Sequence, residues 1–180
     1  MLRTVITLSI FFSLLTASPS FPKVYMTRDK ALSVTFPGAD RIEKKTVFLT
    51  EEQVKKIETL AKSELESKLY TFYAGKKGEE TLGYAVIDTH VLRTKTETLM
   101  IVINPDGTLR QVEILAFFEP QDYMPTDNWL NLFRDEPLNG SLWIGRDIPN
   151  ITGATITSNS LVKSVRRIMA VFEVALKGQN

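Results

Sequence analysis

The chain has 180 residues, 43% of them hydrophobic and 24% charged, with a formal net charge of +1. These values are typical of one globular domain, and the scattered, balanced basic residues give no indication of a nucleic-acid partner. There is no cysteine, which excludes disulfides, iron–sulfur clusters, thiol nucleophiles and C-x-x-C-H haem attachment. The single histidine, His90, argues against a transition-metal site or a Ser/His/Asp triad. Any redox chemistry therefore needs an organic cofactor, and we expect no metal.

Residues 1–20 have the pattern of a secretory signal peptide. Arg3 gives a short positive start, the stretch Val5 to Ala17 is apolar, and Ser18 and Ser20 are small. An uncleaved anchor or a buried strand are the alternative readings. We expect an exported protein, located in the periplasm or on the outer face of the cytoplasmic membrane.

The next two segments predict an extended chain and then a helix. Residues 21–46 carry Pro22, Pro37 and Gly38 with little apolar periodicity, so we expect an extended lead-in to a domain over residues 47–180. Thr50 and Gln53 have the spacing of a capping box, which predicts a helix start. The helical spacing continues through Val54, Ile57, Ala61, Leu65 and Leu69 and predicts a helix that ends before Gly75.

From residue 82 to 118 the pattern changes to strands. Residues 84–96, 98–103 and 109–118 are β-branched or alternating, and Asn104-Pro105-Asp106-Gly107-Thr108 predicts a hairpin turn between the last two. An irregular segment with four prolines follows over residues 119–149.

A closing amphipathic helix follows, with Ser158 as its expected N-cap. Its apolar face comprises Leu161, Val165, Ile168, Met169, Phe172 and Leu176. The element order predicts an α+β fold: an antiparallel meander packed against an N-terminal-side helix and a C-terminal helix.

The sequence just before the closing helix can hold an anion. Thr152-Gly153-Ala154-Thr155 combines small residues with hydroxyls, and a helix N-terminus offers free N–H groups and a positive dipole end. From these residues alone, a phosphate site and ordinary structural capping both remain open.

This stretch closely resembles the flavinylation motif of the FMN-binding domain family, which includes the peripheral flavin subunits of the sodium-pumping NADH:quinone reductase and Rnf complexes. The resemblance implies that a flavin transferase uses FAD to attach FMN through its phosphate to Thr155. It also implies that Asp147, Gly153 and Ala154 form the recognition sequence and that Thr152 and Thr157 belong to the cofactor site.

The resemblance extends from about residue 47 to the C-terminus through the order of Gly83-Tyr84, the Asp106-Gly107 turn, Glu119-Pro120 and the final helix. The chain departs from the family in one place. Many members have Glu-Thr-Pro-Gly after the last strand, whereas this chain has Glu119-Pro120-Gln121-Asp122. The departure concerns contacts with the isoalloxazine ring and leaves Thr155 unaffected.

Several side chains could contact or tune a flavin, each with a structural alternative. Tyr123, Trp129 and Trp143 could wall the ring or pack in the core. Glu119 could hydrogen-bond the ring or cap a loop. His90 and Arg93 could act near the flavin N1 position or lie on a solvated strand face. The helix residues Arg166 and Arg167 could guide an acidic redox partner or only solubilise the helix.

The resulting hypothesis is an exported flavoprotein electron carrier, a membrane-associated or extracytoplasmic electron-transport component. Its donor and acceptor are unidentified and either soluble or membrane-bound. A non-redox binding or assembly module with the same fold is one alternative. A stand-alone enzyme is another, disfavoured because the chain has no nicotinamide fingerprint of the G-x-G-x-x-G type; we therefore expect no catalytic residues.

Overall fold

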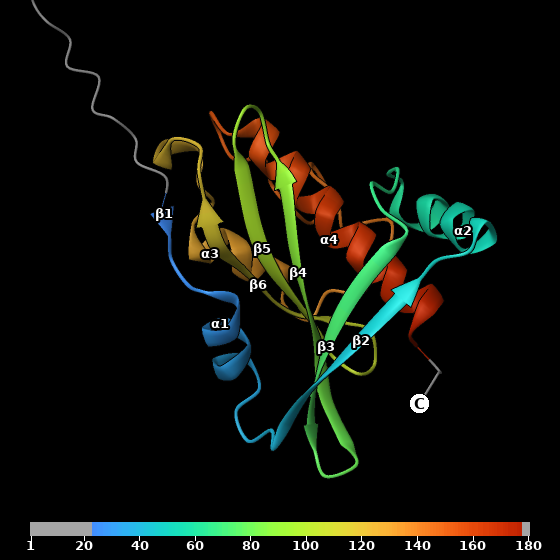
Figure 1. Ribbon diagram of the computed structural model, residues 1–180. Helices are drawn as coiled ribbons and strands as arrows, with labels where there is room; N and C mark the ends of the chain where they lie inside the picture. The colour runs from blue at the N-terminus through green and yellow to red at the C-terminus, as the bar shows by residue number, and fades with distance from the viewer. Residues whose placement is uncertain (1–22, 178–180) are drawn as a thin grey trace, which may run out of the picture.

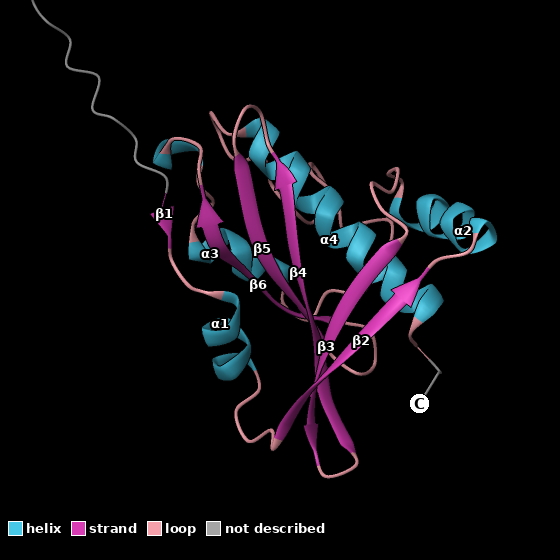
Figure 2. Cartoon of the chain, in the orientation of Figure 1, coloured by secondary structure: helices cyan, strands magenta, loops and turns pink. Residues whose placement is uncertain are grey.

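The computed structural model describes residues 23–177, so the expected signal peptide lies outside the described residues. Six strands and four α-helices follow one another along the chain, with two short 3-10 turns between β6 and α4 (Figure 2). Their bounds are β1 (Lys23–Val24), α1 (Arg28–Thr35), β2 (Arg41–Phe48), α2 (Glu51–Ala61), β3 (Leu69–Lys77), β4 (Glu80–Val91), β5 (Thr96–Ile103), β6 (Leu109–Phe117), η1 (Gln121–Tyr123), α3 (Asp127–Leu130), η2 (Asn131–Phe133) and α4 (Thr155–Ala175).

All six strands form one antiparallel sheet in the order β1-β6-β5-β4-β3-β2. Strands β2 to β6 are a meander, and β1 adds to the free edge of β6. Helix α4 crosses one face of the sheet with α2 beside it (Figure 1). The predicted α+β fold is confirmed.

Alternation along the central strands divides the core between the two faces of the sheet. On β5, Leu99, Ile101 and Ile103 pack under α4, whereas Met100 and Val102 point to the opposite face. Helix α1 covers that opposite face with Ala31 and Leu32.

Strands β3 and β4 separate toward the end of the sheet that lies near the start of α4. They pair from Tyr73 with Ala85 to Lys77 with Glu80, whereas β3 is paired with β2 from Leu69 to Lys76. The two ribbons diverge above this point (Figure 1). The opening holds a cavity of about 440 Å³, lined in part by Tyr70, Asp88 and Arg167. We call it the β3–β4 opening.

The predicted capping box is confirmed at the start of α2. The Gln53 N–H donates to Thr50 Oγ1 at 3.2 Å, and Gln53 Oε1 accepts from the Thr50 N–H at 3.0 Å. The predicted length is wrong, because Lys62 takes a left-handed conformation (φ 54°) that ends the helix at Ala61. Leu69, expected on the helix, instead begins β3.

The predicted hairpin at Asn104 to Thr108 is confirmed between β5 and β6. The Gly107 N–H donates to the Asn104 carbonyl at 3.0 Å, and Gly107 has a φ of 98°, which favours glycine.

Two further expectations differ from the structure. Residues 28–35 form helix α1 within the expected extended lead-in, and β2 begins at Arg41, before the expected domain boundary. Thr27 caps α1 by accepting from the Lys30 N–H, a local signal that the prolines and glycine around it obscured. Within residues 23–177, no helix is long and apolar enough to span a bilayer.

Candidate functional site

Helix α4 begins at Thr155, four residues earlier than an N-cap at Ser158 predicts. Ser158 is not the N-cap: it is fully buried in the first turn, where its hydroxyl donates to the Ala154 carbonyl at 3.0 Å. The cap position belongs to Ala154, whose methyl group cannot accept a hydrogen bond. The first N–H groups of a 21-residue helix therefore lack the side-chain oxygen that normally satisfies them.

The hydroxyl of Thr155 is exposed and oriented by one neighbour. Asn150 Nδ2 donates to Thr155 Oγ1 at 3.0 Å, and Asn150 Oδ1 accepts from Ser158 Oγ at 2.7 Å. Asn150 thus ties the loop before the motif to the first turn of α4. Sequence reasoning missed this role, because the only signal is a polar residue five positions before the threonine.

Gly153 gives the motif its shape. Its φ of 82° lies in the left-handed region, and a Cβ built there meets nothing within 4 Å. Glycine is therefore needed for its conformation, and open space lies above it.

Two hollows meet at Thr155. The Thr155 pocket has a volume of about 250 Å³ and is lined by Arg93, Tyr123, Gly153, Ala154, Thr155, Ile156 and Thr157. Four predicted cofactor residues of the motif, together with Tyr123, thus share one pocket. The Arg93 guanidinium lies 5.4 Å from the centre of the Tyr123 ring, so a cation–π pair forms part of its wall.

The second hollow, the α2–α4 groove, has a volume of about 610 Å³. Thr155 and Ile156 belong to both hollows. The groove contains three cationic side chains and two carboxylates. Its lining residues are Lys62, Ser63, Glu64, Glu66, Leu92, Thr155, Ile156, Asn159, Ser160, Lys163 and Arg167.

Glu119 holds the loop that carries Arg93, a residue of the Thr155 pocket. Its Oε1 accepts from the backbone N–H groups of Thr94 at 2.9 Å and Lys95 at 3.0 Å, in the loop that carries Arg93. These hydrogen bonds, the Thr94 one foremost, outweigh burial and lower the pKa of Glu119. Of its two expected roles, the geometry gives the loop cap, and Glu119 does not line the Thr155 pocket.

The two tryptophans do not line the Thr155 pocket. Trp129 is buried and its indole N–H donates to the Pro149 carbonyl at 2.8 Å, next to Asn150. Trp143 lies under the guanidinium of Arg166, 5.1 Å from ring centre to Cζ. Both tryptophans therefore position the motif or the core, and neither lines the Thr155 pocket.

Two other predicted residues lie outside the pocket. Thr152 and Asp147 are exposed, and neither lines the two hollows at Thr155. Asp147 donates its N–H to the Ser141 carbonyl at 3.2 Å. Their side chains face solvent, where another protein could contact them.

The structure tests the alternative placements expected for His90, Arg93 and Arg166. His90 is 5% exposed, so a solvated strand face is wrong for it, whereas Arg93 is exposed and lines the Thr155 pocket. Arg166 is 2% exposed and cannot guide a partner. It donates to the carbonyls of Leu60, Ala61, Asn139 and Leu142.

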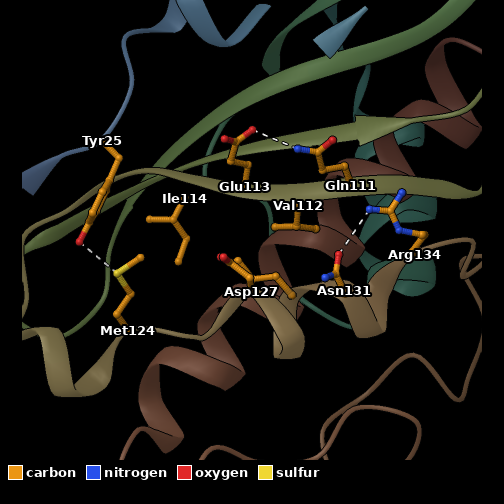
Figure 3. Close-up of a pocket in the computed structure, with 10 residues that line it drawn as sticks. Tyr25, Gln111, Val112, Glu113, Ile114, Met124, Asp127, Asn131 and Arg134 are labelled. Carbon is orange, nitrogen blue, oxygen red and sulfur yellow. Dashed lines mark hydrogen bonds between the residues drawn. The ribbon is translucent and has the colours of Figure 1, made fainter. Parts of the chain in front are cut away.

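Another cavity, of about 410 Å³, lies between β6 and α3, and Figure 3 shows Tyr25, Ile114, Asp127 and Asn131 around it. None of the predicted site residues lines it.

The residues around Thr155 fit a flavin phosphate. An exposed hydroxyl stands on the first residue of a helix whose cap side chain accepts no hydrogen bond, beside a glycine with open space above it. The helix N-terminus favours negative charge, and Arg93 adds a cation. The two hollows offer room for a planar ring system.

Comparison with known proteins agrees with this site. No curated protein matches the chain. Residues 94–170 match the family model described as FMN-binding domain, a range that runs from the loop between β4 and β5 into α4 and includes the whole Thr155 motif. The match covers this part of the chain and supports an FMN-binding domain there, and with it a flavin-binding protein.

Proposed function

We propose that the protein is an exported electron carrier with FMN attached through its phosphate to Thr155 Oγ1. The observation that carries the proposal is the exposed Thr155 hydroxyl at the uncapped start of α4, shared by two hollows. Bound flavin supplies one- and two-electron redox chemistry, and covalent attachment prevents its loss to a dilute medium.

The attachment is a phosphoryl transfer from FAD catalysed by a flavin transferase. Thr155 Oγ1 forms a bond to the phosphorus of the FMN half, the pyrophosphate bond of FAD breaks, and AMP leaves. The hydroxyl proton goes to a base of the transferase. In this chain, Asn150 orients the hydroxyl, and the N–H groups that open α4 stabilise the added negative charge.

The exposed positions of Thr152 and Asp147 support a recognition role. A transferase has to bind the motif from outside, and both residues are exposed. The Arg93–Tyr123 pair offers an aromatic surface and a positive charge next to the attached group.

The decisive experiment is intact and peptide mass spectrometry of protein from a host that expresses a flavin transferase. We expect the mass of FMN on the peptide that contains Thr155. Thr155→Val, which keeps the shape of the side chain, abolishes the addition, whereas Thr155→Ser, which keeps a hydroxyl, retains it in part. An unmodified wild-type protein without bound flavin would instead favour the binding-module alternative.

Export is tested separately by cell fractionation of the full chain carrying a C-terminal tag. We expect recovery outside the cytoplasm and loss of about the first 20 residues. Recovery of the unprocessed chain in the cytoplasm contradicts export and leaves the attachment chemistry standing.

A further inference from the structure

Three ionisable side chains lie between the sheet and α4 and take no part in the proposed attachment. Asp88 and His90 come from β4, and Glu97 faces His90 from β5. His90 Nδ1 lies 2.9 Å from Asp88 Oδ2, and His90 Nε2 lies 3.5 Å from Glu97 Oε1. The imidazole is thus held between two carboxylates, and we call the three residues the His90 cluster.

His90 and Glu97 are buried, and the cluster is incompletely hydrogen-bonded. The side chain of His90 is 3% exposed and that of Glu97 is 0% exposed. Among the residues that the structure describes, His90 Nε2 and both oxygens of Glu97 have no hydrogen-bond partner. A buried carboxylate that accepts no hydrogen bond is costly when ionised, and a bound proton reduces that cost.

The surrounding groups favour a shared proton. Burial would lower the pKa of His90, but Asp88 and Glu97 outweigh it and raise the pKa to about 9. Burial raises the pKa of Glu97, and His90 offsets this only in part. Burial would also raise the pKa of Asp88, but hydrogen bonds from His90 and from Ser164 on α4 lower it.

Arg167 and Tyr70, on other elements, also contribute to the electrostatic environment of Asp88. Arg167 of α4 lies near Asp88 and 3.3 Å from Glu66, and burial raises the pKa of Tyr70 on β3 to about 12, so Tyr70 stays neutral.

The arrangement suits a proton better than a metal ion. The two carboxylates approach opposite nitrogens of one ring and do not converge on a common point. No group of His, Cys, Asp or Glu within residues 23–177 is placed to hold a metal ion. Protons from solvent can reach the cluster, because Asp88 lines the β3–β4 opening and its side chain is 20% exposed.

Two elements connect the His90 cluster to Thr155. Ser164 donates to Asp88, and a rise of about 1.5 Å per residue puts Ser164 roughly 13 Å from Thr155 along α4. The strand that carries His90 continues into Leu92 and Arg93, which line the two hollows at Thr155. A charge at Thr155 is therefore close enough to act on a buried ionisable group.

We propose that the His90 cluster is a buried proton-binding site whose affinity for a proton rises when negative charge is placed at the N-terminus of α4. We identify that charge with the flavin phosphoester and the electron added to the flavin, and this identification rests on the proposed function. The proton-binding role of the cluster does not rest on it. The proton comes from solvent and forms an O–H bond on Glu97 or an N–H bond on His90, and no electron moves within the cluster. Proton uptake thereby offsets charge gained at Thr155.

The single histidine makes the first test direct, because the imidazole NMR signals of the unmodified full chain belong to His90 alone. We expect His90 to titrate near pH 9, and Glu97→Gln to lower its pKa. Titration near the ordinary value of about 6.5 in the wild-type protein would overturn the proposal.

Coupling is tested without flavin by comparing Thr155→Glu with its neutral match Thr155→Gln. At low ionic strength, the negative charge raises the pKa of His90 by roughly 0.5 relative to the glutamine variant. The same pair of changes at Thr46, which is exposed on β2 two strands away from β4, serves as the control, and we expect it to shift the pKa of His90 less. Equal pKa values in the two Thr155 variants contradict coupling.

Flavinylated protein gives an independent readout. We expect the pKa of His90 to be higher after flavinylation, and the flavin potential to depend less on pH in Glu97→Gln than in wild type. If no flavin is attached, the proposed function fails. The pKa of His90 in the two Thr155 variants then still tests the proton-binding role of the His90 cluster. If flavin is attached but His90 titrates identically with and without it, only the present proposal fails.

Discussion

Asn150 is the residue that makes the Thr155 hydroxyl a defined target. Its side-chain amide donates to Thr155 Oγ1 and accepts from Ser158 Oγ. The Ser158 hydroxyl can also donate to the Ala154 carbonyl, so it retains an acceptor when Asn150 is replaced. Asn150→Ala therefore removes the orientation of Thr155 without leaving Ser158 unsatisfied. We expect the loss of about 1 kcal/mol in stability and flavinylation that is roughly five-fold slower.

The rate is measured by mass spectrometry over time with purified transferase, and the stability by urea unfolding. Asn128→Ala, at an exposed position on α3, serves as the matched control and keeps the wild-type rate. An Asn150→Ala protein modified at the wild-type rate would show that the transferase, and not this chain, orients the hydroxyl.

A substitution at Gly153 tests whether the motif needs a left-handed backbone at this position. Because its φ is 82° and a Cβ would meet no atom, Gly153→Ala costs only the left-handed conformation, about 1–2 kcal/mol. Gly140→Ala is the control, since Gly140 has no such φ and its Cβ would make an ordinary contact. We expect that variant to be as stable as wild type or slightly more stable in urea unfolding. Equal effects of the two changes would contradict the conformational argument.

At the residue scale, the motif could be predicted from the sequence, whereas its support could be predicted only as alternatives for Glu119 and Arg93, and not at all for Asn150. Thr155 and its small neighbours are contiguous, so a linear pattern carries them. The supporting contacts join residues that are far apart in the sequence. Glu119 hydrogen-bonds the loop that carries Arg93, and Arg93 lies over the ring of Tyr123, a contact that only the structure shows.

At the scale of elements, Arg166 fastens α2 and the 139–142 loop to α4. Its guanidinium donates four hydrogen bonds to backbone carbonyls, two of them in the last turn of α2. Arg166→Met leaves those carbonyls without a donor in a buried place, which costs about 3–5 kcal/mol.

The measurement is thermal and urea unfolding, with Lys163→Met as the control on the exposed face of the same helix. We expect the Lys163 variant to stay within about 0.5 kcal/mol of wild type. A similarly small loss for Arg166→Met would show that other contacts hold α2 in place.

The elements that the sequence predicted are those with local signals. The Thr50–Gln53 capping box and the Asn104–Thr108 turn each lie within a few residues, and both are confirmed. Strand β3 was missed because Leu65 and Leu69 continue the helical spacing of α2, and the ending at Lys62 depends on a left-handed residue that is not glycine. The burial of Arg166 was missed because its acceptors lie far away in sequence.

For the whole molecule, we expect the His90 cluster to make the free energy of unfolding depend on pH between about 6.5 and 9. The folded protein binds the His90 proton more tightly than the unfolded chain does, with a pKa of about 9 against 6.5. This stabilisation is complete below about pH 6.5 and is lost as the pH rises to about 9, and it amounts to about 3 kcal/mol. The raised pKa of Glu97 acts in the same direction from lower pH, whereas the lowered pKa of Asp88 acts oppositely and only in acid.

Urea unfolding of the unmodified protein between about pH 6 and 9 measures this loss. We expect the free energy of unfolding of the wild type to fall across that range, and that of His90→Gln to fall by less than half as much, because glutamine binds no proton. The comparison uses slopes, so a uniform loss of stability in the variant does not affect it. Parallel slopes would mean that His90 titrates alike in the folded and unfolded states, and would contradict a pKa raised by the two flanking carboxylates.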